Sequence, residues 1–290
     1  MGYVYCVPHA GFNDILCQVG ERWEYAREHG RTFVVDARHS TLYDALDNYF
    51  VSLVDNVILH PTENLLRHLN SLKAFPPCST GKVDSPKLWI REPHTYIDVE
   101  TGMDLTFDLK KRYREDVLVC QCLGGSTDGI SCLEKLRFRP EIAETILYAI
   151  EALGTSYCAV HVRNTDYKTD YMSLFRSMYA DVVGKELLVC SDDRECREKA
   201  REFFTESNVI TVTDIPDTGK KPLHLMRTNV REKNLAMLTD LFALAGADRL
   251  FFAHVDGNGP DGCGISGFSL LAEQLRRSPS IRNSVLGLSE

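Results

Sequence analysis

The sequence contains little glycine or proline and no long apolar run. Its 290 residues include 19 Gly and 11 Pro, while 44% are hydrophobic and 26% are charged. These proportions exclude disordered, collagenous and low-complexity proteins and predict a globular chain with room for about two domains. No stretch approaches the ~20 apolar residues that cross a bilayer, and the first residues do not resemble a signal peptide. We therefore expect a cytoplasmic protein without a transmembrane segment.

Positive charge is also scarce. The 33 Lys and Arg stand against 41 Asp and Glu, which gives a net charge of −8. Such a chain on average repels nucleic acid and anionic membranes, so we expect neither as a partner. One basic run, at residues 110–114, either forms a solvated face or binds phosphate, and the solvated face is the simpler interpretation.

Cysteine is present, but without a metal-binding arrangement. The ten cysteines are spread over the chain, and several lie in apolar runs typical of strands, such as Cys6, Cys158 and Cys190. No paired CxxC spacing occurs, so we expect reduced, buried thiols rather than disulfides or zinc ligands. The P-loop, the nucleophile elbow and the GxGxxG fingerprint are absent as well. We expect no metal and no cofactor.

Short apolar runs alternate with amphipathic helical stretches, which predicts an α/β fold with parallel sheets covered by helices. In the first half we expect strands at residues 3–7 and 32–35, helices at 12–28 and 140–153, and a long loop region at 76–102 with one short strand. In the second half we expect strands at residues 157–162, 186–190, 209–212 and 249–255 and helices at 195–204, 232–245 and 268–276. We place a domain boundary near Gly154, which gives domains of residues 1–154 and 155–290.

Polar residues follow three strands of the second half, at the ends where open α/β sheets bind ligands. The first group is His161 to Asp166, with Arg163 between them, and the second is Ser191, Asp192 and Asp193. The third is a glycine-rich run at residues 256–264, followed by Ser266, Gly267, Phe268 and Ser269. Each group alone has a simpler explanation as a turn or a helix cap, but their joint placement predicts one shared crevice.

The residue types in this crevice suit a phosphorylated ligand. Arg163 offers a planar fork of donors to phosphate oxygens. Ser266 and Ser269 add hydroxyls at a helix start, where backbone N–H groups and the helix dipole attract anions, so a diphosphate could be held without a metal. Three further side chains could contact a base or ribose: Asp192, Asp193 and Phe268.

The first strand of the chain leads into a similar turn. Gly11 permits close approach of a ligand to the backbone, and the helix start that follows attracts anions. At the end of the next strand, Asp36 and Arg38 form either a buried ion pair or part of a substrate site, since only their position in the fold supports either role.

Three of these motifs resemble those of a known family. His161-Val162-Arg163-Asn164-Thr165-Asp166 is similar to the HxRxxD motif of the GDP-fucose-dependent fucosyltransferase superfamily, Ser191-Asp192-Asp193 to its second motif, and Ser266-Gly267-Phe268-Ser269 to its third. Residues 11–14, 30–32 and 35–40 look closest to the bacterial nodulation-type α1,6-fucosyltransferases. Gly267 departs from the family pattern, because many members have a second hydroxyl there.

The resemblance implies a GT-B-like architecture of two facing Rossmann-like domains with mostly parallel sheets. The N-terminal domain would lie on the acceptor side and the C-terminal domain would bind the nucleotide sugar. The reaction implied is an inverting, metal-independent transfer of fucose, or a related sugar, from GDP-fucose or a similar nucleotide sugar to a hydroxyl of a glycan acceptor.

The resemblance also implies roles for residues. It assigns Arg163 to the donor diphosphate, residues 266–269 to phosphate and nucleotide, and Asp192 and Asp193 to the nucleoside. Asp14 is the candidate catalytic base, because such a transfer needs the acceptor hydroxyl deprotonated. The further candidates for binding the nucleotide sugar are Gly11, Phe12, Asn13, His161 and Asp166.

Two other interpretations stay open. The chain could be a catalytically silent protein that binds a sugar nucleotide or a glycan and keeps only the fold. It could also be an unrelated doubly wound enzyme of phosphate ester chemistry, although the motifs of such enzymes are absent.

Overall fold

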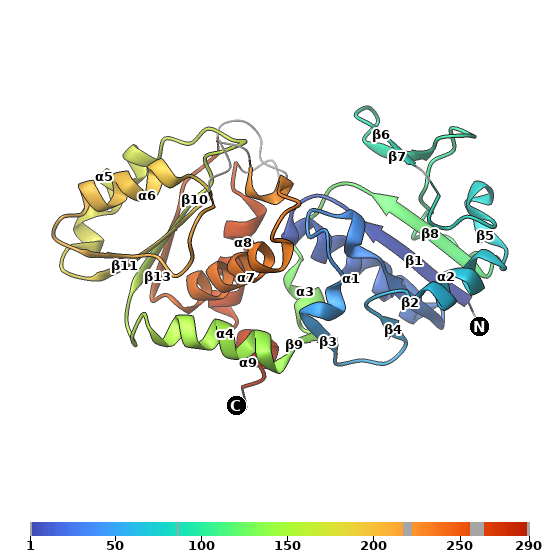
Figure 1. Cartoon of the computed structure of the whole chain (residues 1–290), viewed down its shortest axis with the longest axis horizontal. Helices are drawn as coiled ribbons and strands as arrows, with labels where there is room; N and C mark the ends of the chain where they lie inside the picture. The colour runs from blue at the N-terminus through green and yellow to red at the C-terminus, as the bar shows by residue number, and fades with distance from the viewer. Residues whose placement is uncertain (1, 86, 217–221, 256–263, 289–290) are drawn as a thin grey trace. The chain divides into compact units, whose positions relative to one another are not determined.

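The chain divides into two compact units, Met1–Arg137 and Phe138–Glu290, which we call unit 1 and unit 2 (Figure 1). The computed structural model describes residues 2–85, 87–216, 222–255 and 264–288. The division falls before helix α4 (Pro140–Glu151), whereas the sequence analysis places the boundary near Gly154. Helix α4 belongs to unit 2 because it packs against α7 (Val230–Gly246).

Unit 1 is built on a seven-stranded sheet in the order β4-β2-β1-β8-β7-β6, with β5 paired to β8. Its central strands run parallel and are β1 (Gly2–Pro8), β2 (Arg31–Val35) and β8 (Val117–Cys122). Two short parallel strands extend it, β4 (Val57–Ile58) and β5 (Ala74–Phe75). An antiparallel hairpin closes one edge, β6 (Lys87–Ile90) and β7 (Thr95–Asp98). The prediction of a single short strand at residues 76–102 is therefore wrong.

One long helix covers the centre of this sheet. Helix α1 (Phe12–Glu28) has the bounds that the sequence predicts, and its fully buried residues Ile15, Leu16 and Val19 lie at helical spacing. It packs against β1, β2 and the short helix α3 (Ile130–Leu133). The remaining elements are short: η1 (Ala37–His39), η2 (Leu46–Asn48), β3 (Phe50–Ser52), α2 (Glu63–Asn70), η3 (Pro77–Ser79) and β9 (Leu136–Phe138), which pairs with β3.

Unit 2 has a parallel four-stranded sheet in the order β12-β11-β10-β13. The strands are β10 (Cys158–Val162), β11 (Glu186–Ser191), β12 (Asn208–Ile210) and β13 (Arg249–Phe252). All of β10 and most of β11 are buried, which explains their nearly continuous apolar sequences. The helices besides α4 and α7 are α5 (Tyr171–Val182), α6 (Arg194–Phe203), η4 (Leu223–Leu225), α8 (Gly267–Arg277) and α9 (Pro279–Leu286). The predicted second-half strands and helices are thus confirmed with ends that differ by up to three residues, as in β13, while α5 and α9 were missed.

The two sheets share one winding pattern. In unit 1 the chain passes outward from β1 through β2 to β4 and later adds β8 on the other side of β1. In unit 2 it passes from β10 through β11 to β12 and then adds β13 on the other side of β10. The strand order therefore reverses between β1 and β8 and between β10 and β13. The carboxyl ends of strands at such a switch point are where open α/β sheets bind ligands.

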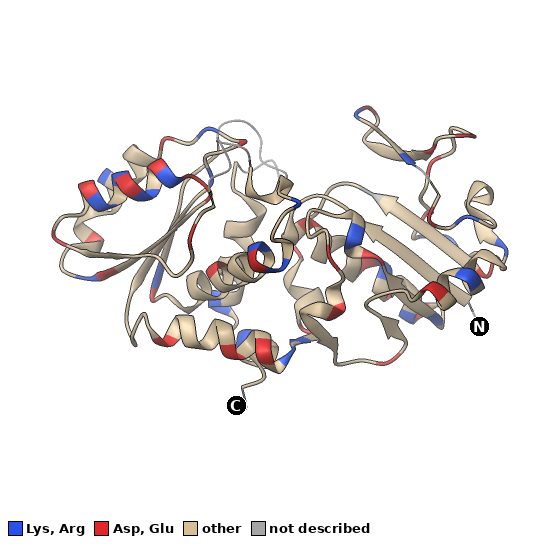
Figure 2. Ribbon diagram, viewed as in Figure 1, with Lys and Arg blue, Asp and Glu red and all other residues tan. Residues whose placement is uncertain are grey.

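The positions of the described cysteines and charged residues agree with what the composition predicts. Eight of the ten cysteines are described as free thiols, and all eight are buried. Acidic and basic residues alternate along α6, while the strands beside it carry few charges (Figure 2). In the basic run at residues 110–114, Lys111 is exposed and pairs with Asp108, as expected of a solvated face. Across the described part of the chain, no helix combines the length and apolarity needed to cross a membrane.

The buried carboxylate of Asp36, directly after β2, is hydrogen-bonded to a side chain of β1. Asp36 accepts hydrogen bonds from the Tyr5 hydroxyl at 2.9 Å and from Nε and Nη2 of Arg38 at 2.8 Å each. Burial alone would raise the pKa of Asp36, but the hydrogen bonds from Arg38 and Tyr5 outweigh it and hold the pKa below its ordinary value. Of the two interpretations of Asp36 and Arg38, the ion pair is the one observed.

We predict that Asp36→Asn lowers the free energy of unfolding by about 1.5–3 kcal/mol at pH 7, the usual effect of losing hydrogen bonds to a charged group. Urea unfolding measures this, with the exposed Asp108→Asn as the control. The lowered pKa of Asp36 contributes stability above the unfolded-state pKa of about 3.9, and that stability is lost as pH falls through the folded-state pKa. The difference in free energy of unfolding between the wild type and Asp36→Asn should therefore become smaller in acid. Equal losses from the two variants would contradict the prediction.

Candidate functional site

The site in unit 2 begins at the carboxyl end of β10. His161 is 8% exposed, because β10 lies between β11 and β13. Its Nδ1 lies 2.7 Å from the Oγ of Ser269, and its ring centroid lies 5.1 Å from that of Phe268. The bonded residues are 108 positions apart in the sequence. The strand order thus brings the first and third motifs together, as the sequence analysis predicts.

The surroundings of His161 favour a neutral imidazole. Burial lowers its pKa to about 3, helped by the positive charges of Arg163 and Arg197. A neutral imidazole has one donor and one acceptor nitrogen, and the serine hydroxyl can pair with either. His161 therefore connects β10 to α8 without adding charge to the site.

Arg163 is held in place by Asp166. Its Nε and Nη2 donate to the two carboxylate oxygens at 2.8 and 2.5 Å, and its guanidinium lies 5.2 Å from the ring centroid of Tyr167. Burial works to lower the pKa of Arg163, but Asp166 outweighs it and raises the pKa. No described residue accepts a hydrogen bond from Nη1, so one edge of the fork can serve a ligand.

The second motif binds the loop that carries the arginine. Asp192 accepts hydrogen bonds from the Asn164 backbone N–H at 2.8 Å and from the Thr165 hydroxyl at 2.5 Å. Asp193 accepts one from the Asn164 side-chain amide at 2.7 Å and caps α6 through the Glu195 N–H at 3.0 Å. The helix cap that was the simpler explanation of Asp193 is therefore present. The sequence analysis did not predict that Asn164 and Thr165 would bind Asp192 and Asp193.

Ser266 occupies the N-cap position of α8 without capping it. The residue is 5% exposed, and its Oγ finds no hydrogen-bond partner among the described residues. A buried hydroxyl without a partner costs about 1–3 kcal/mol, which a bound acceptor would offset. The helix N-terminus beside it favours an anion. The predicted glycine-rich run falls on residues 256–263, which lie outside the described residues, and on Gly264.

The first-half candidates lie at the start of α1 in unit 1. Gly11 is the N-cap residue, and its N–H donates to Oδ2 of Asp14 at 3.2 Å. Phe12 and Asn13 are each 5% exposed, and the Asn13 amide donates to the Ser126 carbonyl at 3.1 Å. Asp14 thus caps its helix, and its role as a base stays a prediction.

A glycine-rich loop after β8 packs on this helix start and was missed in the sequence. A Cβ added at Gly125 would lie 2.2 Å from Oδ1 of Asp14, and one at Gly129 would lie 2.5 Å from Oδ1 of Asn13. The loop can approach so closely only because both residues lack side chains. The available signal was the largely apolar run at residues 117–123, which is followed by two glycines.

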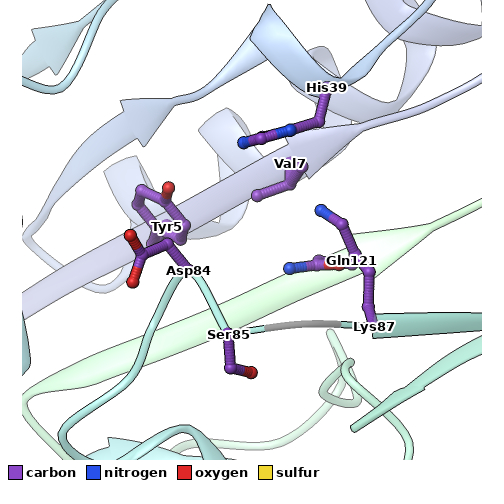
Figure 3. A pocket seen from close by; sticks show the side chains of 7 residues that line it. All are labelled: Tyr5, Val7, His39, Asp84, Ser85, Lys87 and Gln121. Carbon is purple, nitrogen blue, oxygen red and sulfur yellow. The ribbon is translucent and has the colours of Figure 1, made fainter. Parts of the chain in front are cut away.

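A cavity of about 290 Å³ lies at the switch point of unit 1, between β1, β8 and the hairpin (Figure 3). Its lining residues are Tyr5, Val7, His39, Asp84, Ser85, Lys87 and Gln121. In Figure 3, Lys87 and His39 project over β1 near Val7. Burial lowers the pKa of Lys87 to about 8, opposed by the carboxylates of Asp36 and Asp84.

No protein-family model and no curated protein matches the sequence. Solved structures do match. NodZ alpha-1,6-fucosyltransferase soaked with GDP-fucose is 20% identical over 94% of this chain and 92% of its own, with a TM-score of 0.62. POFUT1 in complex with GDP-fucose is 15% identical over 95% and 94%, with a TM-score of 0.58. A mutant of Arabidopsis thaliana FUT1 in complex with GDP is 11% identical over 95% and 68%, with a TM-score of 0.54.

The chain has the fold of these fucosyltransferases. The predicted α/β, GT-B-like fold class is confirmed, with a mostly parallel sheet in each unit. At these identities the likeness concerns the fold, and the activity has to be argued from the site.

We predict that the His161 imidazole stays neutral from pH 8 down to pH 5, as ¹⁵N NMR of the ring nitrogens would show. Because its folded-state pKa of about 3 lies below the unfolded value of about 6.5, the unfolded state binds more protons in between. Stability should therefore fall below pH 6.5, by on the order of 1 kcal/mol per pH unit from this group. His161→Gln should flatten that slope. A titration midpoint near 6.5 would contradict the prediction.

Proposed function

We propose that this chain is an inverting, metal-independent glycosyltransferase that moves fucose, or a related sugar, from GDP-fucose or a similar nucleotide sugar to a glycan hydroxyl. The observation that carries the proposal is the cluster at the switch point of unit 2, where His161 of β10 lies 2.7 Å from the Ser269 hydroxyl of α8 and Arg163 directly follows β10. The Ser266 hydroxyl, which has no partner among the described residues, belongs to the same helix start. Structures with the same fold contain GDP-fucose or GDP.

In this proposal the donor diphosphate lies at the N-terminus of α8. The Ser266 hydroxyl donates to a phosphate oxygen, and the first backbone N–H groups of the helix add their dipoles. The Nη1 edge of Arg163 donates to the diphosphate, and this contact strengthens as negative charge develops on the leaving group. Asp166 keeps the guanidinium in one orientation, so little reorganisation is needed during the reaction.

The acidic residues of the second motif act in this proposal as positioning residues. Asp192 and Asp193 fix Asn164 and Thr165, and thereby the direction of the neighbouring arginine. Each carboxylate oxygen has a second lone pair, so a contact with the nucleoside is compatible with these bonds and stays a prediction.

The acceptor side is assigned to unit 1. An inverting transfer needs the acceptor hydroxyl in line with the anomeric carbon and a base to take its proton. Asp14 is our candidate base, at a helix start that also holds Gly11. The cytoplasmic location belongs to the proposal as well.

We expect Arg163→Ala to lower kcat/KM by about 30- to 1,000-fold, or about 2–4 kcal/mol of transition-state stabilisation. Release of GDP from GDP-fucose, with and without a panel of glycans, measures it. Arg249→Ala is a matched control, because Arg249 also makes a two-pronged pair with a carboxylate, Asp181, and lies over a ring, Phe251. Activity within about threefold of wild type in Arg163→Ala would contradict the assignment. GDP binding without any GDP release from GDP-fucose would favour the silent binding protein.

We also expect GDP release to persist in excess EDTA, since the proposed cradle stabilises the diphosphate with an arginine, hydroxyls and a helix N-terminus. The rate should match that of an untreated sample. Loss of activity in EDTA, with rescue by Mn²⁺ or Mg²⁺, would contradict the metal-independent mechanism.

A further inference from the structure

The cavity of unit 1 carries polar groups that the fold itself does not pair. The Nζ of Lys87 makes no hydrogen bond or ion pair with any described residue, although burial shifts its pKa. Gln121 is 1% exposed, and its Oε1 has no hydrogen-bond partner in the described part of the chain. A buried amide oxygen and a cavity-facing amine without partners indicate a site that a ligand completes.

The remaining polar lining residues are Tyr5, His39, Asp84 and Ser85, and Nε2 of His39 lies 3.9 Å from Oδ2 of Asp36. The Tyr5 hydroxyl donates to Asp36, and the Ser85 hydroxyl donates to Asp98 at 3.3 Å. The carboxylate of Asp84 lies on the exposed rim. The cavity therefore presents a strong donor at Lys87, an acceptor at Asp84, and at Gln121 an amide that can both donate and accept. A ligand that matches them must both accept and donate hydrogen bonds.

Hydroxyl groups meet this requirement, because each one accepts through its oxygen and donates its proton. A carboxylate or phosphate would pair with Lys87, but it would leave the Gln121 oxygen unpaired and would face the negative charge of Asp84. An apolar ligand would leave both unpaired. A volume of about 290 Å³ is at the lower end of ligand pockets and suits a single ring rather than an oligosaccharide.

We propose that this cavity binds one neutral sugar ring, with Lys87 donating to a hydroxyl oxygen and Gln121 accepting a hydroxyl proton. Its position at the carboxyl ends of β1 and β8 is the switch point of the unit 1 sheet. Naming this ring as part of the glycan acceptor rests on the proposed function, but the binding itself does not.

Saturation-transfer NMR on the full chain tests the proposal. The probes are the methyl glycosides of glucose, galactose, mannose and N-acetylglucosamine, with methyl glucuronide as the matched anion. At least one neutral glycoside should bind, and Lys87→Met and Gln121→Met should each weaken its binding about fivefold or more, the usual effect of one hydrogen bond. Lys111→Met is the matched control, because it removes the same charge from an exposed side chain of unit 1.

A second readout needs no variant. Acylation of lysine amines at pH 8, mapped by mass spectrometry, should be slowed at Lys87 by the bound glycoside and unchanged at Lys111. The proposal is overturned if no neutral glycoside binds, if only the glucuronide binds, or if Lys87→Met, shown to be folded by circular dichroism, binds the glycoside as wild type does. Titration of GDP into the same samples keeps the two claims apart, because GDP binding without glycoside binding refutes this inference and leaves the proposed function standing.

Discussion

The order of the strands in unit 2 is the constraint on which the candidate site depends. Because β13 is added beside β10 rather than beside β12, the turn after β10 and the helix after β13 meet at one sheet edge. The hydrogen bond between His161 and Ser269 is the direct expression of that order. It forms in a buried environment that keeps the imidazole uncharged, so the only positive side chain of the first motif is Arg163.

Around that hydrogen bond, carboxylates bind neighbouring polar groups and fix their orientation. Asp166 aligns the arginine fork, while Asp192 and Asp193 bind the intervening loop to the end of β11. In the first and third motifs, two groups lack a partner among the described residues: the Nη1 edge of the Arg163 guanidinium and the Ser266 hydroxyl. Both are hydrogen-bond donors, and Ser266 lies at the N-terminus of α8, a combination of groups that suits a diphosphate.

Much of this arrangement could be predicted from the sequence, for identifiable reasons. Helix α1 has a clear apolar periodicity, and β10 and β11 are uninterrupted apolar runs that end in polar residues, so their positions and the strand-end motifs were readable. The hairpin of β6 and β7 was not, because its strands are half-exposed and lack alternation. The cavity was missed for a related reason: Lys87 and Gln121 come from strands that were not predicted, and only tertiary structure joins them.

The measurement that tests the central claim most directly is calorimetric titration of GDP, GMP and guanosine into the wild-type chain and Ser266→Ala. If the cluster at β10 and α8 binds a diphosphate, GDP should bind at least about tenfold more tightly than GMP, a difference of about 1.4 kcal/mol, and Ser266→Ala should reduce that preference. Equal affinities for GDP and GMP, or a preference that Ser266→Ala leaves unchanged, would contradict the account.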